Sequence, residues 1–573
     1  MITDKISLLK ETIAKEVFIK NNAEQIDLKT DPESWIFDFR KVLMRGSTAN
    51  LISDIFYEMY SSILPFQIGT LEVGGVPLAT SLMNKFYTNG HTDINAFFIR
   101  KSRKKSGLMR MVEGTVVANQ KIILVDDTMN SGGSLWRQIE ILETLGHRVD
   151  TVWSIIRYRD HKYYQRFHNR GIKVHSLFTL NDFTDVLGSN IKNIVDKDET
   201  PPLMPFVGKW IFKAPKPSFS YVIGKSQPTL DSDTIYLGSD NETFYAINQE
   251  DGTVRWKFSV GKKVAGKSIF SNPLLYKNMV IFGSYDGNVY ALDKTSGKKC
   301  WVSFEADYVG SSPAVADDLN LIFIGLEFGL FRKHGGIVAL KADTGKTIWT
   351  DYSHPAFTHC SPTYIAPYQQ VVIGSNDGVV RLYDAKSGKK LWDFTTFGGA
   401  KFDKESDAGF GEGEIKEAFA YDEIRDHIIF GATDGFLYIL ERATGHLVKH
   451  FACEFGIWAT PVIYKDRVYF TSLDKRLRCI DLDTLELLFD KNIDGTRIFS
   501  SPVIIEGLLY VGTNAGRLHE LNPDTGEQLG YYQTLERITT SPLYNQQTKR
   551  FFIPTYANEI ICITKSITNN KDS

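Results

Sequence analysis

The segment at residues 121–134 carries the side chains with the clearest chemical use. An apolar run, 122–125, ends in two carboxylates, Asp126 and Asp127, and a loop of small polar residues and glycines follows up to Ser134. Apolar residues at helical spacing come next. This order predicts a buried strand, an anion-binding loop and a helix whose N-terminal amides face a phosphate. The carboxylates repel a phosphate, so they suit a group beside it: sugar hydroxyls, a metal ion or a developing cation.

This segment resembles the phosphoribosyl-diphosphate (PRPP) signature of type I phosphoribosyltransferases. The resemblance implies that Asp126 and Asp127 bind the ribose hydroxyls and act in catalysis. It also implies that the loop cradles the 5′-phosphate with a set of small residues: Thr128, Asn130, Ser131, Gly132, Gly133 and Ser134. Read alone, the motif has an alternative interpretation as a surface strand-loop-helix of another α/β domain.

A basic run resembles the mobile catalytic loop of orotate phosphoribosyltransferases, which reads Arg-Lys-x-x-Lys-x-His-Gly. Arg100, Lys101, Lys104 and Gly107 match it, whereas Ser106 stands where the family has histidine. A departing pyrophosphate is strongly negative, and cations that close over it stabilise the transition state. The resemblance therefore implies catalytic roles for the arginine and the two lysines. The alternative is a solvated basic loop or a nucleic-acid patch.

Residues 69–79 are similar to the pyrophosphate loop of the same family. Two adjacent glycines permit close approach of the backbone to an anion, although such a pair is commonly only a turn. The position of this segment upstream of the basic run follows the order of the family. The resemblance therefore adds Glu72, Gly74 and Gly75 to the PRPP site.

The base site departs from the family pattern. Lys29 lies in a segment similar to the one whose lysine reaches the substrates, and either Arg157 or Arg159 corresponds to the base-recognition arginine. The family stretch Ser-Gly-Arg-x-Ser-Pro is replaced by residues 30–34. The resemblance thus supports PRPP as a ligand more than orotate as the acceptor. It also implies Mg²⁺ carried mainly by PRPP, with no protein ligand assigned, and a homodimer through the N-terminal domain.

A charged and proline-rich stretch divides the chain into two domains. We expect an α/β phosphoribosyltransferase-like domain, a central mostly parallel sheet with flanking helices, at residues 1–197. A linker at 198–207, an all-β propeller at 208–567 and a tail at 568–573 follow. The length of 573 residues is too great for one core. The family resemblance covers about residues 1–195.

The second part repeats short strands separated by Asp-Gly and Thr/Ser-Gly turns. Tryptophans close four successive units, 43 to 48 residues apart, at Trp256, Trp301, Trp349 and Trp392. This is the period of a four-stranded propeller blade. The repeats resemble those of pyrroloquinoline-quinone (PQQ) propellers. We expect eight blades, the last combining strands in 540–565 with a strand near Trp210, and seven blades as the alternative.

The propeller shows no catalytic constellation. Quinoprotein dehydrogenases of the family that these repeats resemble use a pair of adjacent cysteines beside the cofactor. This chain has no such pair, so no PQQ is expected. The repeated tryptophans and glycines are interpreted as structural. A propeller of this kind most often presents a binding face, here for an unknown protein or nucleic-acid partner. The glycine-rich insertion at 398–413 is either a surface loop or a binding loop.

Composition narrows the function classes. The net charge of −2 gives no overall drive toward nucleic acid or acidic membranes. We expect a cytoplasmic protein with reduced thiols, because the five cysteines are scattered and we find neither a signal-peptide core nor a membrane-spanning run.

Three functional interpretations follow. The first is a working phosphoribosyltransferase with a regulatory or targeting propeller. The second is a PRPP or nucleotide sensor with little turnover, which Ser106 and the altered base segment favour. The third is a scaffold with a vestigial enzyme domain, against which the intact Asp-Asp and Ser-Gly-Gly-Ser sequences argue. By analogy with gene cassettes that contain such domains, the first two suit a bacterial stress or antiviral defence role.

Overall fold

The computed structural model describes residues 2–20, 35–72, 74–100, 112–188, 205–217, 226–261, 268–330, 333–404 and 411–565. Contacts between Cα atoms divide the chain into two units, Met1–Met204 and Pro205–Ser573. Within the described ranges, no helix combines the length and the apolar character needed to cross a bilayer.

The first unit is built on a six-stranded sheet. Its strand order is β5-β4-β3-β6-β7-β8, and every neighbouring pair is parallel except β4 and β5. A separate two-stranded ribbon pairs β1 with β2. The strands of this unit are β1 (Phe18–Lys20), β2 (Trp35–Phe37), β3 (Phe66–Leu71), β4 (Ala96–Ile99), β5 (Val112–Glu113), β6 (Lys121–Met129), β7 (Thr151–Arg157) and β8 (Lys173–Thr179).

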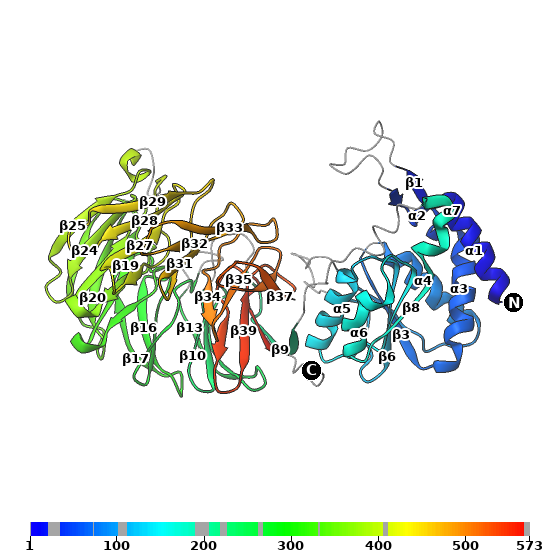
Figure 1. Ribbon diagram of the computed structural model, residues 1–573. Helices are drawn as coiled ribbons and strands as arrows, with labels where there is room; N and C mark the ends of the chain where they lie inside the picture. Colours follow the sequence, from blue (N-terminus) through cyan, green and yellow to red (C-terminus); the bar gives the residue numbers. More distant parts are fainter. Residues whose placement is uncertain are drawn as a thin grey trace. The chain divides into compact units, whose positions relative to one another are not determined.

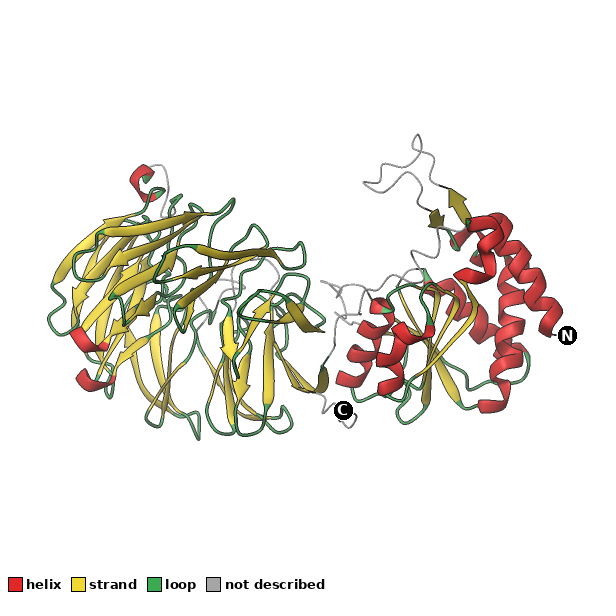
Figure 2. Cartoon of the chain, in the orientation of Figure 1, coloured by secondary structure: helices red, strands yellow, loops and turns green. Residues whose placement is uncertain are grey.

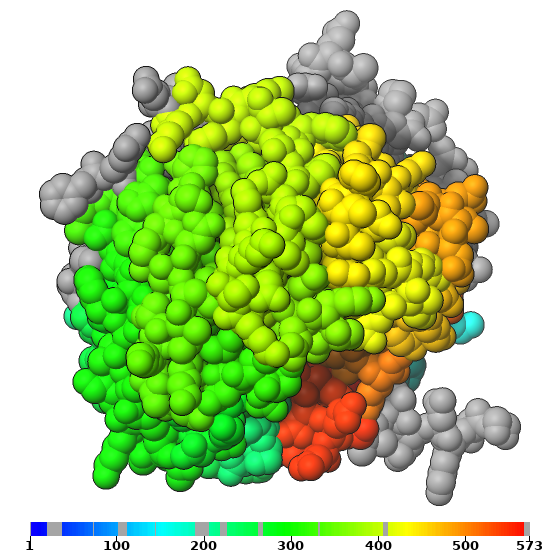
Figure 3. Space-filling view, turned by 90° about the vertical axis from the view of Figure 1, so that its left-hand side faces the viewer, coloured from blue at the N-terminus to red at the C-terminus, as the bar shows by residue number. Residues whose placement is uncertain are grey.

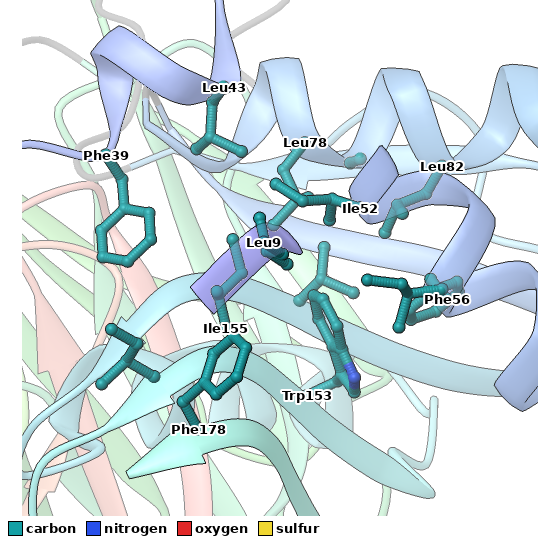
Figure 4. Packing of buried hydrophobic residues seen from close by; sticks show 14 of the residues in the cluster. Leu9, Phe39, Leu43, Ile52, Phe56, Leu78, Leu82, Trp153, Ile155 and Phe178 are labelled. Atoms are coloured by element: carbon teal, nitrogen blue, oxygen red, sulfur yellow. The ribbon is translucent and has the colours of Figure 1, made fainter. Parts of the chain in front are cut away.

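Helices cover both faces of this sheet (Figures 1 and 2). The core between the sheet and the N-terminal helices includes Leu9, Ile52, Phe56, Leu78 and Trp153, all almost fully buried (Figure 4). Apolar residues at helical spacing supply the helix side of this core. The helical segments are α1 (Ile2–Glu16), α2 (Arg40–Leu43), α3 (Gly46–Tyr60), η1 (Ser61–Ile63), α4 (Gly75–Thr88), α5 (Gly133–Thr144), η2 (His161–Tyr164), α6 (Gln165–Asn169), η3 (Leu180–Phe183) and α7 (Thr184–Leu187).

The strand order reverses between β3 and β6. The chain runs from β3 through α4 to β4 on one side, and from β6 through α5 to β7 on the other. In open parallel sheets, ligands bind at the carboxyl ends of the strands where the order reverses. The fold therefore places its binding crevice beside the ends of β3 and β6.

The second unit is a ring of eight four-stranded antiparallel blades. The expected eight blades are confirmed, and the seven-blade alternative is wrong. In chain order the strands of the first four blades are β10 (Thr229–Leu230), β11 (Thr234–Gly238), β12 (Thr243–Asn248), β13 (Val254–Ser259); β14 (Leu274–Tyr276), β15 (Met279–Gly283), β16 (Asn288–Asp293), β17 (Lys299–Phe304); β18 (Ala314–Ala316), β19 (Leu321–Phe328), β20 (His334–Lys341), β21 (Thr347–His354); β22 (Thr363–Ile365), β23 (Gln370–Gly374), β24 (Val379–Asp384), β25 (Lys390–Thr395).

The remaining blades follow the same pattern, and the eighth takes strands from both ends of the unit. Strand β40 pairs with β9, so no blade of the ring is left without its fourth strand. In Figure 3 the red C-terminal strands lie beside blue-green residues near the start of the propeller. The strands are β26 (Ala420–Asp422), β27 (His427–Gly431), β28 (Phe436–Glu441), β29 (Leu447–Ala452); β30 (Val462–Tyr464), β31 (Arg467–Thr471), β32 (Arg476–Asp481), β33 (Leu487–Asn492); β34 (Val503–Ile505), β35 (Leu508–Gly512), β36 (Arg517–Leu521), β37 (Gln528–Gln533); β38 (Leu543–Asn545), β39 (Arg550–Thr555), β40 (Glu559–Lys565) and β9 (Phe206–Lys213).

Strand β9 begins within the range expected as linker. Phe206 is completely buried in the core of the last blades, and its ring meets Phe551 edge-on with centroids 5.5 Å apart. The ladder with β40 includes residues 206 and 207. Burial of this aromatic ring therefore carries the strand two residues into 198–207.

In blades 1 to 4, the repeated tryptophans join each blade to the following one, as expected. Trp301 of blade 2 donates its indole N–H to Ala342 O of blade 3 at 3.0 Å. Its ring lies against Gly345, where a Cβ would come within 2.4 Å of the indole. Trp256, Trp349 and Trp392 donate in the same way to the following blade at 2.8–3.0 Å. The repeated Trp and Gly residues are therefore structural.

Candidate functional site

Polar residues from three strands meet at the carboxyl edge of the α/β sheet. Register pairs Thr70 with Val125 and Leu71 with Ile99. The residues that follow, Glu72, Arg100 and Asp126, therefore leave the sheet side by side, although they are far apart in the sequence. The edge is the one predicted by the reversal of strand order.

The acidic pair is half-buried at the end of β6. The Asp127 N–H donates to Asp126 Oδ1 at 3.0 Å, and Thr128 Oγ1 donates to Asp127 Oδ1 at 3.2 Å. Burial, together with the charge of Asp127, raises the pKa of the Tyr158 phenol, which keeps that group neutral. Both side chains are partly exposed at the rim of the sheet, where carboxylate oxygens can accept hydrogen bonds from sugar hydroxyls.

The loop after the acidic pair has the geometry of an anion cradle. Gly132 has a φ of +70°, and a Cβ there would lie 2.9 Å from Met129 Cε and 3.0 Å from the Phe167 ring. Only glycine fits this left-handed position without strain. Helix α5 begins at Gly133, whose N–H bonds Ser131 Oγ at 3.3 Å. The first turn of α5 thus presents its amides at the loop.

Tyr164 and Arg166, which the sequence alone did not point to, bind the carbonyl oxygens of this loop. The Tyr164 hydroxyl lies 2.9 Å from Met129 O and 2.7 Å from Asn130 O, and it donates its proton to these two carbonyls. Arg166 donates through Nη2 to Ser131 O. The loop carbonyls therefore turn toward η2 and α6. The alternation of basic and aromatic residues over 157–170 is the sequence signal that marks this segment.

The two candidate base-recognition arginines take different places. Arg159 is 8% exposed, and its Nε donates to Asn130 Oδ1 at 3.1 Å, so it belongs to the support of the phosphate loop. Arg157 ends β7 and pairs in register with Met129. Its Nε is buried and has no hydrogen-bond partner among the residues that the structure describes.

The loop between β3 and α4 requires its second glycine. A Cβ on Gly75 would lie 1.8 Å from Thr70 Oγ1, which donates to Val125 O at 2.8 Å. Helix α4 therefore starts directly against the sheet. Gly74 is exposed and has open space around it. The Glu72 N–H bonds Ile99 O at 2.8 Å, which fixes the start of the loop.

Arg100 lies between two carboxylates. Its guanidinium nitrogens are 3.6 Å from Glu72 Oε1 and 3.6 Å from Glu113 Oε1. Strand β5 brings Glu113 there by pairing it with Phe98, a contact that no local sequence signal predicted. Arg100 Nε is buried without a hydrogen-bond partner in the described part of the chain. The cation is thus held near the acidic pair, with donor capacity left over.

The remaining predicted residues are placed as follows. Thr128 lies near the end of β6, Asn130 and Ser131 lie on the β6–α5 connection, and Ser134 lies in the first turn of α5. Lys29, Lys101 and Lys104 lie outside the described residues. In the ranges that the structure describes, no group of three or more His, Cys, Asp or Glu side chains could hold a metal ion.

Two protein-family models match the chain. The model described as phosphoribosyl transferase domain matches residues 49–171. The model described as outer membrane protein assembly factor BamB matches residues 118–359 and 376–571, which is more than half of the chain. This second match starts inside the α/β unit, whereas the first propeller strand begins at Phe206.

Curated relatives match the N-terminal unit. The orotate phosphoribosyltransferase of Bradyrhizobium sp. (strain ORS 278) is 29% identical over 151 residues, which is 26% of this chain and 80% of the relative. The orotate phosphoribosyltransferase of Rhodopirellula baltica is 28% identical over 156 residues, again 26% of this chain and 80% of the relative. The N-terminal domain is therefore homologous to orotate phosphoribosyltransferases.

Solved structures match the propeller. BamB from Moraxella catarrhalis superposes with a TM-score of 0.50 at 16% identity, over 63% of this chain and 99% of that one. A quinohemoprotein alcohol dehydrogenase from Comamonas testosteroni gives a TM-score of 0.50 at 13% identity, over 64% of this chain and 78% of that one. At these identities the likeness shows the fold alone.

Proposed function

This chain belongs to the family described as outer membrane protein assembly factor BamB, and its residues 49–171 match a phosphoribosyl transferase domain. From that second match and the geometry of the site, we propose that the protein is a PRPP-dependent phosphoribosyltransferase. It transfers phosphoribose to a nucleobase-like acceptor and releases pyrophosphate. The observation that carries the proposal is the Asp126–Asp127 pair at the end of β6, beside a glycine loop at the N-terminus of α5.

Each chemical group of PRPP is proposed to bind a different segment of the site. The 5′-phosphate accepts hydrogen bonds from the amides of 131–134, and the ribose hydroxyls donate to Asp126 and Asp127. The diphosphate lies toward the β3–α4 loop, where Gly75 allows close approach and Arg100 supplies a cation. The chemistry is attack of a base nitrogen at C1′ of the ribose. The C1′–diphosphate bond breaks, the electron pair leaves with pyrophosphate, and the acidic pair stabilises the oxocarbenium-like state.

The counter-ion and the base have fewer protein partners. Mg²⁺ is proposed to arrive as the PRPP complex, as the family resemblance implies. Arg157 is the better of the two arginines for the base, because the Nε of Arg159 already bonds Asn130. Lys29, Lys101 and Lys104 complete the site from the segments that the family resemblance assigns.

The propeller is proposed to bind a macromolecular partner, a protein or a nucleic acid, so that transfer is coupled to that partner. A homodimer through the N-terminal domain, as the resemblance implies, completes the proposed assembly. A role in a bacterial stress or antiviral defence system suits an enzyme domain joined to a larger interaction domain.

A second function is favoured by two specific observations. Arg100 is already engaged by Glu72 and Glu113, each at 3.6 Å, and Ser106 replaces the family histidine in the basic run. Both features weaken stabilisation of the leaving pyrophosphate. The alternative is a PRPP or nucleotide sensor with weak turnover.

The proposal is tested first by calorimetric titration of Mg²⁺–PRPP into the wild type and an Asp126→Asn/Asp127→Asn variant. Each lost bond to a charged acceptor is worth about 1.5–3 kcal/mol, so affinity should fall by about a hundredfold or more. The matched control is Asp93→Asn, an exposed carboxylate before β4 and therefore at the opposite edge of the sheet. Unchanged affinity in the double variant would sink the proposal.

A second assay separates the enzyme from the sensor. Pyrophosphate release is measured with PRPP and each common nucleobase in turn. Release that depends on one base identifies the acceptor and supports the transferase. Tight PRPP binding with no release for any base favours the sensor.

A further inference from the structure

A cavity of about 350 Å³ lies on the axis of the propeller, in a place that the phosphoribosyl transfer does not use. Every blade contributes lining residues from the start of its first strand, and these are mostly hydroxyl, amide and proline side chains. Its volume is within the usual range of small-ligand sites. Only one charged residue lines it, Glu417.

Hydrogen bonds between blades build the wall of this cavity. In five of the eight blades, the residue two positions before the first strand carries a side-chain oxygen that accepts a backbone N–H from the preceding blade. The Asn272 N–H donates to Ser312 Oγ at 2.9 Å, and the Thr460 N–H donates to Ser501 Oγ at 2.9 Å. Equivalent bonds join blades 8 and 1, 1 and 2, and 3 and 4.

Blade 5 breaks this pattern at two consecutive residues. Ala418 occupies this position in blade 5 and offers no side-chain oxygen, whereas the other seven blades have Ser, Thr, Asn or Gln there. Glu417 stands where the other blades have a small residue: Ser226, Ser271, Ser311, Cys360, Ala459, Ser500 and Thr540. A small residue is thus replaced by a long carboxylate in the one blade that has no side-chain oxygen at the next position.

The Glu417 carboxylate has no counter-charge within the described residues. It makes no hydrogen bond or ion pair with them, although its main-chain carbonyl accepts from Cys360 Sγ at 2.9 Å. The adjacent Lys416 is committed elsewhere, because its Nζ lies 2.5 Å from Glu414 Oε2 and over the ring of Trp458. The half-buried Glu417 carboxylate lines the cavity without a counter-charge, so this position suits a cationic ligand.

We propose that the axial cavity binds a primary ammonium group, which pairs with the Glu417 carboxylate and with side-chain oxygens of the surrounding wall. A single carboxylate balances a single positive charge. An ammonium group brings three donors, which suits a wall of hydroxyl and amide oxygens. A divalent metal prefers several carboxylate or carbonyl ligands, and no cluster of three acidic, His or Cys side chains occurs in the described ranges.

The protonation of Glu417 should couple to binding. Burial raises the pKa of this carboxyl to about 7. The titratable groups nearest to it are the buried Cys360 thiol and the Lys416–Glu414 pair, and the other cavity residues are uncharged. Binding of an alkylammonium, which stays protonated below pH 9, is therefore stronger at pH 8 than at pH 5.5.

The test titrates n-butylamine into the full-length protein by calorimetry at pH 8 and pH 5.5. The expected result is saturable binding at pH 8, at least about tenfold weaker in Glu417→Gln and in wild type at pH 5.5. Glu417→Ser restores the residue type of other blades and should also lose binding, which keeps the test valid if Glu417→Gln folds poorly. The matched control is Glu423→Gln, which removes an exposed carboxylate from the same blade.

Further arms separate the sources of the ammonium group. Tighter binding of Nα-acetyl-lysine methylamide than of n-butylamine identifies a lysine side chain of a partner, and the reverse identifies a free amine. Equal n-butylamine binding in wild type and Glu417→Gln overturns the proposal. So does calcium binding that depends on Glu417 with no amine binding, because it assigns the cavity to a metal. Failure of PRPP to bind in its own assay leaves this result unaffected, because the two sites lie in different units.

Discussion

Asp126 and Asp127 of the α/β unit stay half-buried at the rim of a sheet, whereas Asp377 and Asp474 of the propeller are buried against arginine. Asp377 pairs with Arg381 at 2.6 Å, and Asp474 pairs with Arg478 at 2.7 Å, each four residues apart. Both propeller pairs also include a serine, so their polar atoms are satisfied within the blade. The α/β pair is accessible from the edge where strands and loops converge.

The difference teaches how to interpret polar residues in a repeat protein. A polar residue that recurs at the same place in several blades is bonded within the repeat and stabilises it. Glu417 departs from the repeat and has no such partner among the described residues. Glu417 in the propeller therefore resembles the acidic pair of the α/β unit more than it resembles the aspartates of neighbouring blades.

Among the variants that test this difference between the two units, Asp377→Asn is expected to have the largest effect on stability. Removal of the carboxylate leaves the Arg381 guanidinium buried without a counter-charge, so the free energy of unfolding of the propeller should fall by about 3 kcal/mol. PRPP affinity should stay unchanged. Urea unfolding, followed by tryptophan fluorescence, measures the first effect and calorimetry the second.

The matched control for this variant lies in the same blade. Asp393 pairs with Lys390 at 2.5 Å, but both side chains are about half exposed. Asp393→Asn should therefore cost less than about 0.5 kcal/mol. Equal losses in the two variants would contradict the assignment of Asp377 as a buried structural carboxylate.

A pH-dependent effect should distinguish Glu417 from the repeated aspartates. Its pKa is raised to about 7 by burial, so between pH 4.5 and pH 7 the unfolded chain loses this proton before the folded chain does. Stability contributed by this group is present at low pH and is lost as pH rises, by about 2–3 kcal/mol in total. Unfolding of wild type and Glu417→Gln between pH 5 and pH 8 measures it.

The opposite sign applies to Asp377. Burial opposes its ionisation, but the Arg381 pair outweighs that effect and holds the pKa of Asp377 below its ordinary value. Its contribution is therefore present at neutral pH and is lost on acidification. The contradicting result for Glu417 is a difference in the free energy of unfolding between wild type and Glu417→Gln that stays constant from pH 5 to pH 8. It would show that the Glu417 carboxylate is stabilised by partners, as the Asp377 carboxylate is.

The smallest effect concerns the support of the phosphate loop. Tyr164→Phe removes the hydroxyl bonded to Met129 O and Asn130 O, so PRPP affinity should fall about fivefold. The matched control is Tyr163→Phe, on the same short helix. A loss of stability without any loss of affinity would show that Tyr164 only fills space. Comparable losses of affinity in the two variants would also contradict its role in positioning the loop.

Much of both units was predictable because its signals are local. The strand, acidic pair, glycine loop and helix occupy one continuous segment, so residue types reveal the anion cradle. The blade period is visible because each Trp must meet a glycine turn about one repeat further on, as Trp301 meets Gly345. Glu113 and Tyr164 escaped notice because β pairing and a distant helix bring them to the site.

The sequence by itself determined the strand-loop-helix at 121–134, the two-domain organisation and the blade repeat, because spacing and turn residues act over short ranges. Only the tertiary structure decided that Glu72, Arg100 and Asp126 share one edge, because crossover connections choose which parallel strands are neighbours. The same holds for Glu417. Its sequence context shows a departure from the repeat, but the closure of eight blades around one axis is what places it in a cavity.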